Sequence, residues 1–159
     1  MSTGEPATIS GFPRLEARSL DGRAYQLPED LEGHLNLLLV GFEWWQQRLI
    51  DSWVPPLEEL AGRRPGLRFY ELVAVPRSRL PVRRIIDGGM VAGIPDRGVR
   101  ARTLTAYTDL GKLLAALDLE GTRNIALFLT DRAGRISWRA AGAHSAADQA
   151  ALEGALGLR

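Results

Sequence analysis

Two apolar patterns in the first half of the chain predict a buried strand followed by a helix. Residues 35–42 are apolar almost without alternation, which is typical of a strand buried on both faces. Between residues 46 and 61 the apolar positions recur at the spacing of one helix face, and Pro55 and Pro56 are expected to kink that helix. Its apolar residues are Leu49, Ile50, Trp53, Val54, Leu57, Leu60 and Ala61.

The later segments continue this alternation of strands and helices. The patterns predict strands over residues 67–75 and 99–107, and helices over residues 82–91 and 109–117. The stretches "NIALFLT" and "RISWRAA", joined by "DRAG", predict two further strands.

Local signals at the two ends of the chain complete the prediction. An Asp-Gly pair within residues 15–28 indicates a hairpin, and Ser145 with Asp148 indicates the capped start of a last helix that ends at Gly157. Parallel crossovers early and an antiparallel hairpin late predict an α/β fold with a mixed sheet. We expect one domain over residues 12–159, preceded by a flexible tail over residues 1–11.

Composition removes several kinds of chemistry. The 159 residues contain no cysteine, which excludes disulfides, thiolate nucleophiles and thiol redox cycling. A formal net charge of +1 gives no general attraction to nucleic acid, so no nucleic-acid partner is expected. The first residues resemble neither a secretory signal nor a transit peptide, and no apolar run is long enough to cross a bilayer. A cytoplasmic protein is therefore the expectation.

The order of the predicted elements resembles the thioredoxin-like fold, in the longer form shared by peroxiredoxins and membrane-tethered thiol oxidoreductases. "FPRL" followed by "LDGRAYQLP" is similar to the N-terminal hairpin of those families, and "LLLVGF" is similar to their central strand. "ALFLTDRAGRISWRAAG" is similar to their closing hairpin. The resemblance implies a mixed sheet flanked by helices, with a peroxiredoxin-type hairpin at its N-terminal end.

The same resemblance implies that the redox groups of this fold are absent. If Pro55 is the helix-kinking proline of the family, Gln47 and Ile50 stand at the two cysteine positions of its Cys-x-x-Cys motif. The loop that carries a cis-proline in the family reads "TRN" before Ile125. A redox-inactive protein, without thiol–disulfide oxidoreductase or peroxidase activity, is therefore expected.

A closer resemblance is to the mitochondrial ATP synthase assembly-factor family that is built on this fold. The similar stretches are the Phe-Pro start, "FEWWQQRLIDSWVPPLEEL", "LRFYELVAV", and "YTDLGKLLAALDL" leading into "ALFLTDRAGRISW". The resemblance implies a non-catalytic, chaperone-like role in assembly of a membrane complex, with peripheral association with that complex. It implies no catalytic residue and no cofactor.

The turn after the central strand is the candidate binding site for a partner protein, because thioredoxin-like proteins hold peptides there. Trp44 and Trp45 are candidate aromatic anchors, and the alternative is that at least one of them packs under the next helix. The two glutamines that follow either contact a peptide or are solvated. The candidate partner-binding residues are Glu43, Trp44, Trp45, Gln46, Gln47, Tyr107 and Asn124.

A second candidate is an anion-binding surface in the arginine-rich segment of residues 76–102. Seven arginines stand there against Asp87 and Asp96. They fit phosphate, anionic lipid or an acidic partner, and the alternative is a solvated face with internal salt bridges. The candidate anion-binding residues are Arg79, Arg83, Arg84, Arg100 and Arg102.

Other chemistry has weaker support in the sequence. His34 and His144 lack the spacing of metal ligands, so no metal site is expected. An alternative to the binding function is a diverged peroxiredoxin-like enzyme with non-thiol chemistry through Glu43, Asp51 or Arg139. A homodimer joined through an edge strand or through the face of Trp44 is the third alternative.

Overall fold

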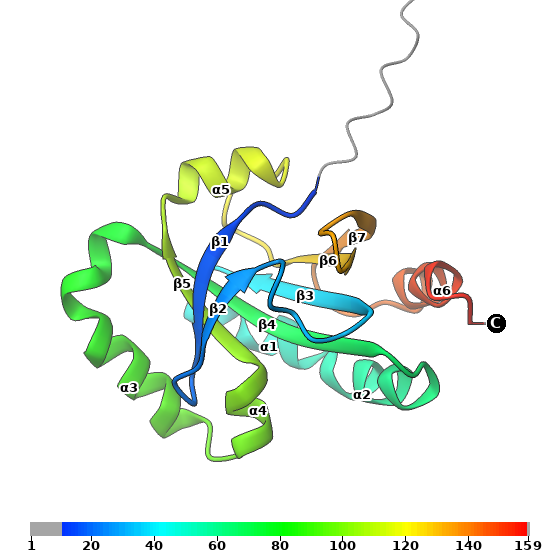
Figure 1. Ribbon diagram of the computed structural model, residues 1–159, viewed down its shortest axis with the longest axis horizontal. Coiled ribbons are helices and arrows are strands. Elements are labelled where there is room, and N and C mark those ends of the chain that lie inside the picture. The colour runs from blue at the N-terminus through cyan, green and yellow to red at the C-terminus, as the bar shows by residue number, and fades with distance from the viewer. Residues whose placement is uncertain (1–10, 159) are drawn as a thin grey trace, which may run out of the picture.

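The computed structural model describes residues 11–158, which form one seven-stranded mixed sheet with helices on both faces (Figure 1). The strand order is β2-β1-β5-β4-β3-β6-β7. The strands are β1 (Leu15–Ser19), β2 (Ala24–Leu27), β3 (Leu35–Gly41), β4 (Leu67–Pro76), β5 (Thr103–Thr108), β6 (Ala126–Asp131) and β7 (Ile136–Ala141). The helices are η1 (Trp44–Gln46), α1 (Gln47–Asp51), α2 (Val54–Arg63), η2 (Arg77–Val82), α3 (Arg83–Gly93), α4 (Arg97–Arg102), α5 (Leu110–Ala116) and α6 (Ala146–Ala155).

The pairing of the strands confirms the predicted mixed α/β sheet. β3, β4 and β5 are parallel neighbours, whereas β1, β2, β6 and β7 pair antiparallel. The three parallel strands therefore end at the same edge of the sheet, which we call the carboxyl edge. Gly41, the last residue of β3, lies beside Val73 of β4, and β4 continues in the same direction for three more residues, to Pro76.

Two apolar clusters cover the two faces of the sheet. On one face, leucines of α2 and α6 pack on alternate residues of β3 and β6, with Trp53 among them. On the other face, Leu113 and Leu117 pack from the region of α5. β3 is buried on both faces, as its continuous apolar run predicts: Leu37 and Leu38 are both fully buried.

The predicted single helix over residues 46–61 is wrong in one respect. The chain forms η1, α1 and α2 in succession, and the last break falls at Ser52 and Trp53. Pro55 and Pro56 stand in the first turn of α2, where a backbone N–H has no partner within the helix. The two prolines therefore begin a new helix rather than kink a continuous one.

The predicted strand over residues 99–107 is wrong in its first half. Residues 97–102 form α4, because the side chain of Asp96 caps its start and accepts a hydrogen bond from the backbone N–H of Val99 at 3.1 Å. The strand begins only at Thr103. The Ser145 cap of the last helix is confirmed, and its hydroxyl oxygen accepts from the N–H of Asp148 at 3.1 Å.

The N-terminal tail expected over residues 1–11 lies outside the described residues, apart from Gly11. Gly11 forms an isolated antiparallel bridge with Arg135. Among the residues that the structure describes, no helix is both long and apolar enough to cross a membrane.

Candidate functional site

A groove of about 880 Å³ lies at the carboxyl edge, between η1–α1–α2 on one side and α3–α4 on the other. Figure 1 shows α3 and α4 at the lower left and α1 and α2 at the lower centre and right, with β4 crossing the view above α1, α2 and α4. The floor is the face of β4 that carries Glu71, Val73 and Val75. Most of the wall is apolar, and its residues include Phe42, Trp44, Val54, Pro55, Ile86 and Met90.

Trp44 and Trp45 stand on the short turn between β3 and α1, and both are exposed. Trp44 stands at the rim of the groove with 88% of its surface exposed, and Trp45 is 42% exposed. The alternative that one of them packs as core is therefore wrong. The tryptophan buried under the helices is Trp53, which lies two residues beyond the end of α1 and caps the start of α2.

Gln46 holds this turn in place from inside the protein. Its side chain is fully buried, and its Oε1 accepts hydrogen bonds from the N–H of Phe42 at 2.8 Å and of Glu43 at 3.1 Å. Its Nε2 donates to the carbonyl oxygen of Thr122 at 2.7 Å. The alternative that Gln46 is solvated is wrong, because its buried amide joins the turn to the loop before Ile125.

The other predicted partner-binding residues occupy different positions around the carboxyl edge. Glu43 and Gln47 line the groove, and Gln47 Nε2 donates to Asp51 Oδ1 at 2.9 Å. Asn124 is exposed, and its Oδ1 accepts from the N–H of Ile125 at 2.9 Å. Tyr107 does not line the groove. Its hydroxyl donates a hydrogen bond to Asp87 at 2.9 Å.

The burial of Tyr107 and its carboxylate neighbour raise the pKa of its phenol above the usual range. Its hydroxyl therefore stays protonated and keeps donating its hydrogen to α3. Tyr107 positions that helix, which forms one wall of the groove. A direct role for Tyr107 in partner binding stays a prediction.

Two of the five candidate anion-binding arginines form contacts within the protein itself. Arg100 closes the end of α3 by donating from Nη2 to the carbonyl oxygen of Val91 at 3.0 Å. Arg102 stacks over the ring of Phe69 at 4.5 Å and forms an ion pair with Glu58 at 3.3 Å. These contacts fit the alternative of internal salt bridges.

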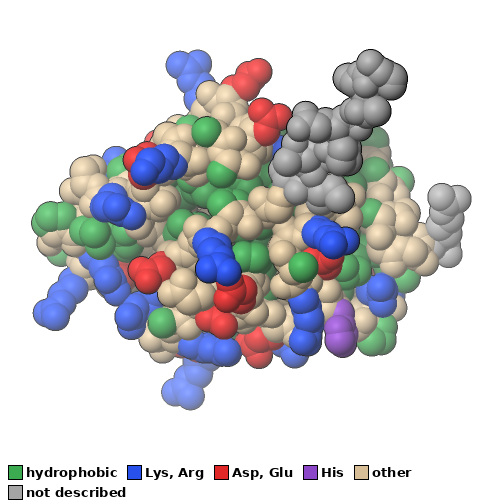
Figure 2. Space-filling view, turned by 45° about the horizontal axis from the view of Figure 1, so that its top comes forward, with side chains coloured by type: hydrophobic (Ala, Val, Ile, Leu, Met, Phe, Trp, Pro, Cys, Tyr) green, Lys and Arg blue, Asp and Glu red, His purple; other side chains and the backbone are tan. Residues whose placement is uncertain are grey.

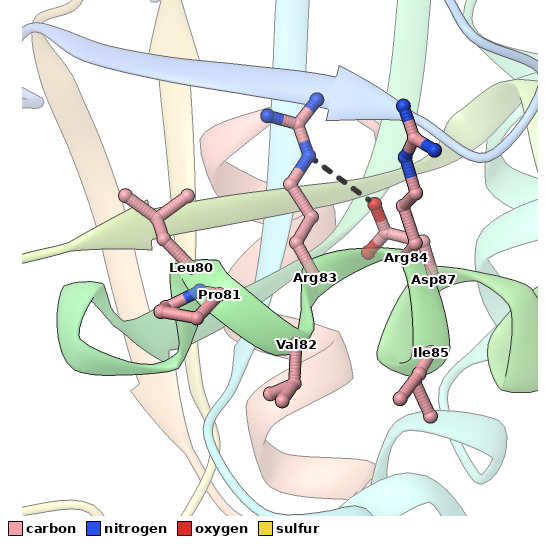
Figure 3. A pocket seen from close by; sticks show the side chains of 7 residues that line it. All are labelled: Leu80, Pro81, Val82, Arg83, Arg84, Ile85 and Asp87. Atoms are coloured by element: carbon pink, nitrogen blue, oxygen red, sulfur yellow. Dashed lines mark ion pairs between the residues drawn. The ribbon is translucent and has the colours of Figure 1, made fainter.

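The remaining three arginines lie close together on η2 and α3. Arg83 forms an ion pair with Asp87 at 3.6 Å, and its guanidinium lies 5.9 Å from the ring centre of Tyr107. Arg79 and Arg84 are exposed and form no ion pair within residues 11–158. Figure 3 shows Arg83 and Arg84 projecting from the same side of the helix, and Val82 and Ile85 projecting from the opposite side.

Glu71 is a candidate that the sequence analysis missed. It is a carboxylate in the middle of the apolar strand β4, it is 3% exposed, and it lies in the floor of the groove. Burial raises the pKa of its carboxyl group above the ordinary value of 4.5. The only signal in the sequence is this one charged residue inside the otherwise apolar run of residues 69–75.

A hydrogen bond donated by the hydroxyl of Thr103 would favour the ionised form of Glu71 and oppose this rise in pKa, so the direction of that hydrogen bond matters. Thr103 Oγ1 lies 3.0 Å from Glu71 Oε2 and 2.6 Å from the carbonyl oxygen of Val99. A hydroxyl has one hydrogen to donate, so it cannot serve both acceptors at once. If Glu71 is protonated, it donates to Thr103, and Thr103 donates to Val99, so that both contacts are satisfied.

We therefore expect Glu71→Gln to reproduce the protonated state at every pH. Wild-type Glu71 binds its proton more tightly in the folded than in the unfolded chain. Its contribution to stability is complete below pH 4.5 and is lost as the pH rises through the raised pKa. The glutamine variant avoids this loss, so its free energy of unfolding at pH 8 should exceed that of the wild type. Urea unfolding between pH 5 and 8 measures the difference, which should shrink towards the acidic end.

Glu43→Gln is the control for that experiment, because it removes an exposed carboxylate from the same groove. It should change stability by less than about 0.5 kcal/mol at either pH. A Glu71→Gln protein less stable than the wild type at pH 8 would show that the fold requires the ionised carboxylate.

The three residues named for non-thiol catalysis do not converge. Glu43 and Asp51 line the groove together with Glu71. Arg139 instead lies over the ring of Phe128 at 5.0 Å and donates to the carbonyl oxygen of Leu117. Phe128 and Leu117 belong to the cluster on the opposite face of the sheet, so Arg139 is separated from the two carboxylates.

No protein-family model matches the sequence, and the comparison with curated proteins finds no match either. Solved structures do match, over nearly the whole chain. A proposed electron transfer protein from Aquifex aeolicus VF5 has a TM-score of 0.65 at 16% identity, covering 92% of this chain and 94% of that one. A thiol:disulfide interchange protein from Bacteroides sp. has a TM-score of 0.57 at 15% identity, covering 91% and 86%.

A third similar structure is the exposed lipoprotein thioredoxin (Etrx1) of Streptococcus pneumoniae strain TIGR4. Its TM-score is 0.57 at 18% identity, with coverage of 92% of this chain and 100% of that one. At such low identity the likeness shows the fold alone. Because these 159 residues contain no cysteine, the protein has a thioredoxin-like fold without the thiols of thiol–disulfide exchange.

Proposed function

We propose that this protein is a redox-inactive thioredoxin-like protein that acts by binding a segment of a partner protein in the groove beside Trp44. The observation that carries the proposal is the groove itself, a concave and mostly apolar surface with an exposed tryptophan at its rim. Concave apolar surfaces with a few fixed polar groups are typical of binding sites. Aromatic anchors contribute much of the energy of such contacts.

An assembly or chaperone-like role is the form of binding that we favour. It is supported by the resemblance of "FEWWQQRLIDSWVPPLEEL" and "YTDLGKLLAALDL" to the ATP synthase assembly-factor family. A subunit of a membrane complex such as ATP synthase is therefore the kind of partner proposed. Such subunits carry apolar segments, and the apolar wall of the groove suits them.

One glycine in the wall of the groove can be replaced in order to block binding there. Gly89 lies in α3 and lines the groove, and a Cβ atom built on it meets nothing within 4 Å. A side chain can therefore start from residue 89 without a clash at its Cβ atom, and we expect the ring of Gly89→Trp to occupy the groove. α3 should gain stability because glycine is a poor helix former. Partner capture and cross-linking with the wild type and with Gly89→Trp are expected to show at least a tenfold loss of the captured partner.

Gly88→Trp is the matched control. Gly88 precedes Gly89 in the same helix, is equally open, and does not line the groove. A partner lost with Gly89→Trp and kept with Gly88→Trp supports binding in the groove. Equal capture by both variants would contradict the proposal, and reduction of insulin disulfides or turnover of peroxide would contradict its redox-inactive part.

A diverged enzyme with non-thiol chemistry is the second candidate. It is favoured by Glu71, a buried carboxyl group with a raised pKa at the floor of the groove. Glu43 and Asp51 line the same groove. We rank it second because Arg139, the cation named for that chemistry, lies on the other face and most of the groove wall is apolar.

A further inference from the structure

The large apolar side chains that the described residues expose are confined to two short segments. They are Trp44 at 88%, Trp45 at 42%, Leu80 at 41%, Val82 at 44% and Ile85 at 76% exposed. Scattered exposed apolar residues are ordinary, but a concentrated set marks an interaction surface.

Sheet topology places the two segments at one edge of the molecule. The first segment follows β3 and the second follows β4, and these strands are parallel neighbours. Both segments therefore emerge from the carboxyl edge. Figure 2 shows apolar and basic side chains next to each other at the end of the molecule where α3 lies in Figure 1.

The charge around the apolar side chains of the second segment is positive. Arg77, Arg79, Arg83 and Arg84 belong to the second segment, and Asp87 is the acidic residue that lines the hollow there with Arg83 and Arg84. Asp87 is already paired with Arg83. On the first segment, Glu43 precedes the tryptophans and Arg48 follows them.

We propose that this edge, defined by residues 44–45 and 77–85, docks on the surface of an anionic lipid bilayer. Tryptophan is favoured at the boundary between headgroups and acyl chains, where Val82 and Ile85 would bury their side chains. Arg83 and Arg84 project from the side of the helix opposite Val82 and Ile85 (Figure 3), so their long side chains must bend back along the helix to reach lipid phosphates. An acidic protein would pair with the arginines but leave the apolar side chains exposed to water. An anionic bilayer can pair with the arginines through its phosphates and also bury the apolar side chains.

The proposal is independent of partner binding in the groove. Four residues of this edge do not line the groove: Trp45, Arg77, Arg84 and Ile85. They can therefore be changed while its wall is kept, and Gly89→Trp fills the groove while these four residues are kept. Failure of one proposal is thus distinguishable from failure of the other.

The test is co-sedimentation of the full chain with vesicles of phosphatidylcholine alone or with about one third phosphatidylglycerol. We expect binding to the anionic vesicles only, and weaker binding as salt is raised. Arg77→Gln/Arg84→Gln should weaken partitioning about 30-fold, at about 1 kcal/mol for each basic residue near an anionic surface. Trp45→Ser/Ile85→Ser should weaken it at least about tenfold.

Arg132→Gln/Arg135→Gln is the matched charge control. These exposed arginines lie in the β6–β7 turn, beside the start of β3 and so at the opposite edge of the sheet. This variant and Gly89→Trp should partition like the wild type. Thermal unfolding checks that each variant is folded.

Three results would overturn the proposal. The first is an absence of binding to the anionic vesicles. The second is binding to poly-glutamate as tight as binding to vesicles and unaffected by Trp45→Ser/Ile85→Ser, which would assign the edge to an acidic protein. The third is a dimer in sedimentation velocity that dissociates in Trp45→Ser/Ile85→Ser, which would assign the edge to a second copy of the chain.

Discussion

Trp53→Ala is expected to lower the free energy of unfolding by about 4 kcal/mol, the largest effect that we foresee for a single substitution. Trp53 is fully buried between β-sheet and helices, at the break between α1 and α2. Its ring meets Trp138 edge to face at 6.2 Å and His144 at 5.0 Å. Its Nε1 donates to the carbonyl oxygen of Gly142 at 2.9 Å, so alanine removes both packing and a hydrogen bond.

Urea unfolding followed by far-ultraviolet circular dichroism measures this loss without depending on tryptophan fluorescence. Trp53→Phe is the control, because it keeps much of the apolar volume and removes the hydrogen bond. It should cost less than half as much as alanine. Equal losses in the two variants would mean that the hydrogen bond to Gly142, and not packing, carries the contribution of this residue.

Gln46→Leu is expected to cost about 3 kcal/mol, the second largest effect. Leucine is similar in size but leaves the N–H groups of Phe42 and Glu43 and the carbonyl oxygen of Thr122 without their present partner. Buried polar groups that lose a partner keep the cost of their lost hydration. The loss should appear in urea unfolding, and protection of the Phe42 amide against hydrogen exchange should fall.

Gln47→Leu provides the comparison for Gln46→Leu. It is the same substitution one residue later, at an exposed position whose amide donates to Asp51 at 2.9 Å and, at 3.4 Å, to Glu71. We expect a change within about 1 kcal/mol. If the two substitutions were equally costly, burial of the Gln46 amide would not be what holds this turn.

Much of the fold could be predicted because its signals are local. The continuous apolar run of β3 and the Ser145 cap of α6 depend on neighbouring residues, and both were confirmed. α4 was missed because a six-residue helix with three arginines has little periodicity, and the Asp96 cap and packing decide its state. The break at Trp53 was missed because a proline at a helix start looks the same in sequence as a proline within a helix.

The candidate site was predicted only in part, because some of its residues are recognised from their neighbours in sequence and others only from contacts with distant parts of the chain. Trp44 and Trp45 were recognised because they follow a predicted strand, and no packing partner had to be known. Gln46 and Gln47 are indistinguishable in sequence, and only the contact between Gln46 and Thr122, far along the chain, separates a buried amide from an exposed one. Glu71 required knowledge that β5 brings Thr103 beside it.

The position of β3 also sets a condition on synthesis of the chain. β3 is fully apolar at its centre and pairs with β4 on one side and with β6 on the other. On the ribosome, β4 emerges soon after β3, but β6 follows only after residues 77–125. Until then one edge of the most apolar strand has no partner, which is the arrangement that favours aggregation. During synthesis of residues 77–125, the unpaired edge of β3 is therefore where a general chaperone would protect the nascent chain from aggregation.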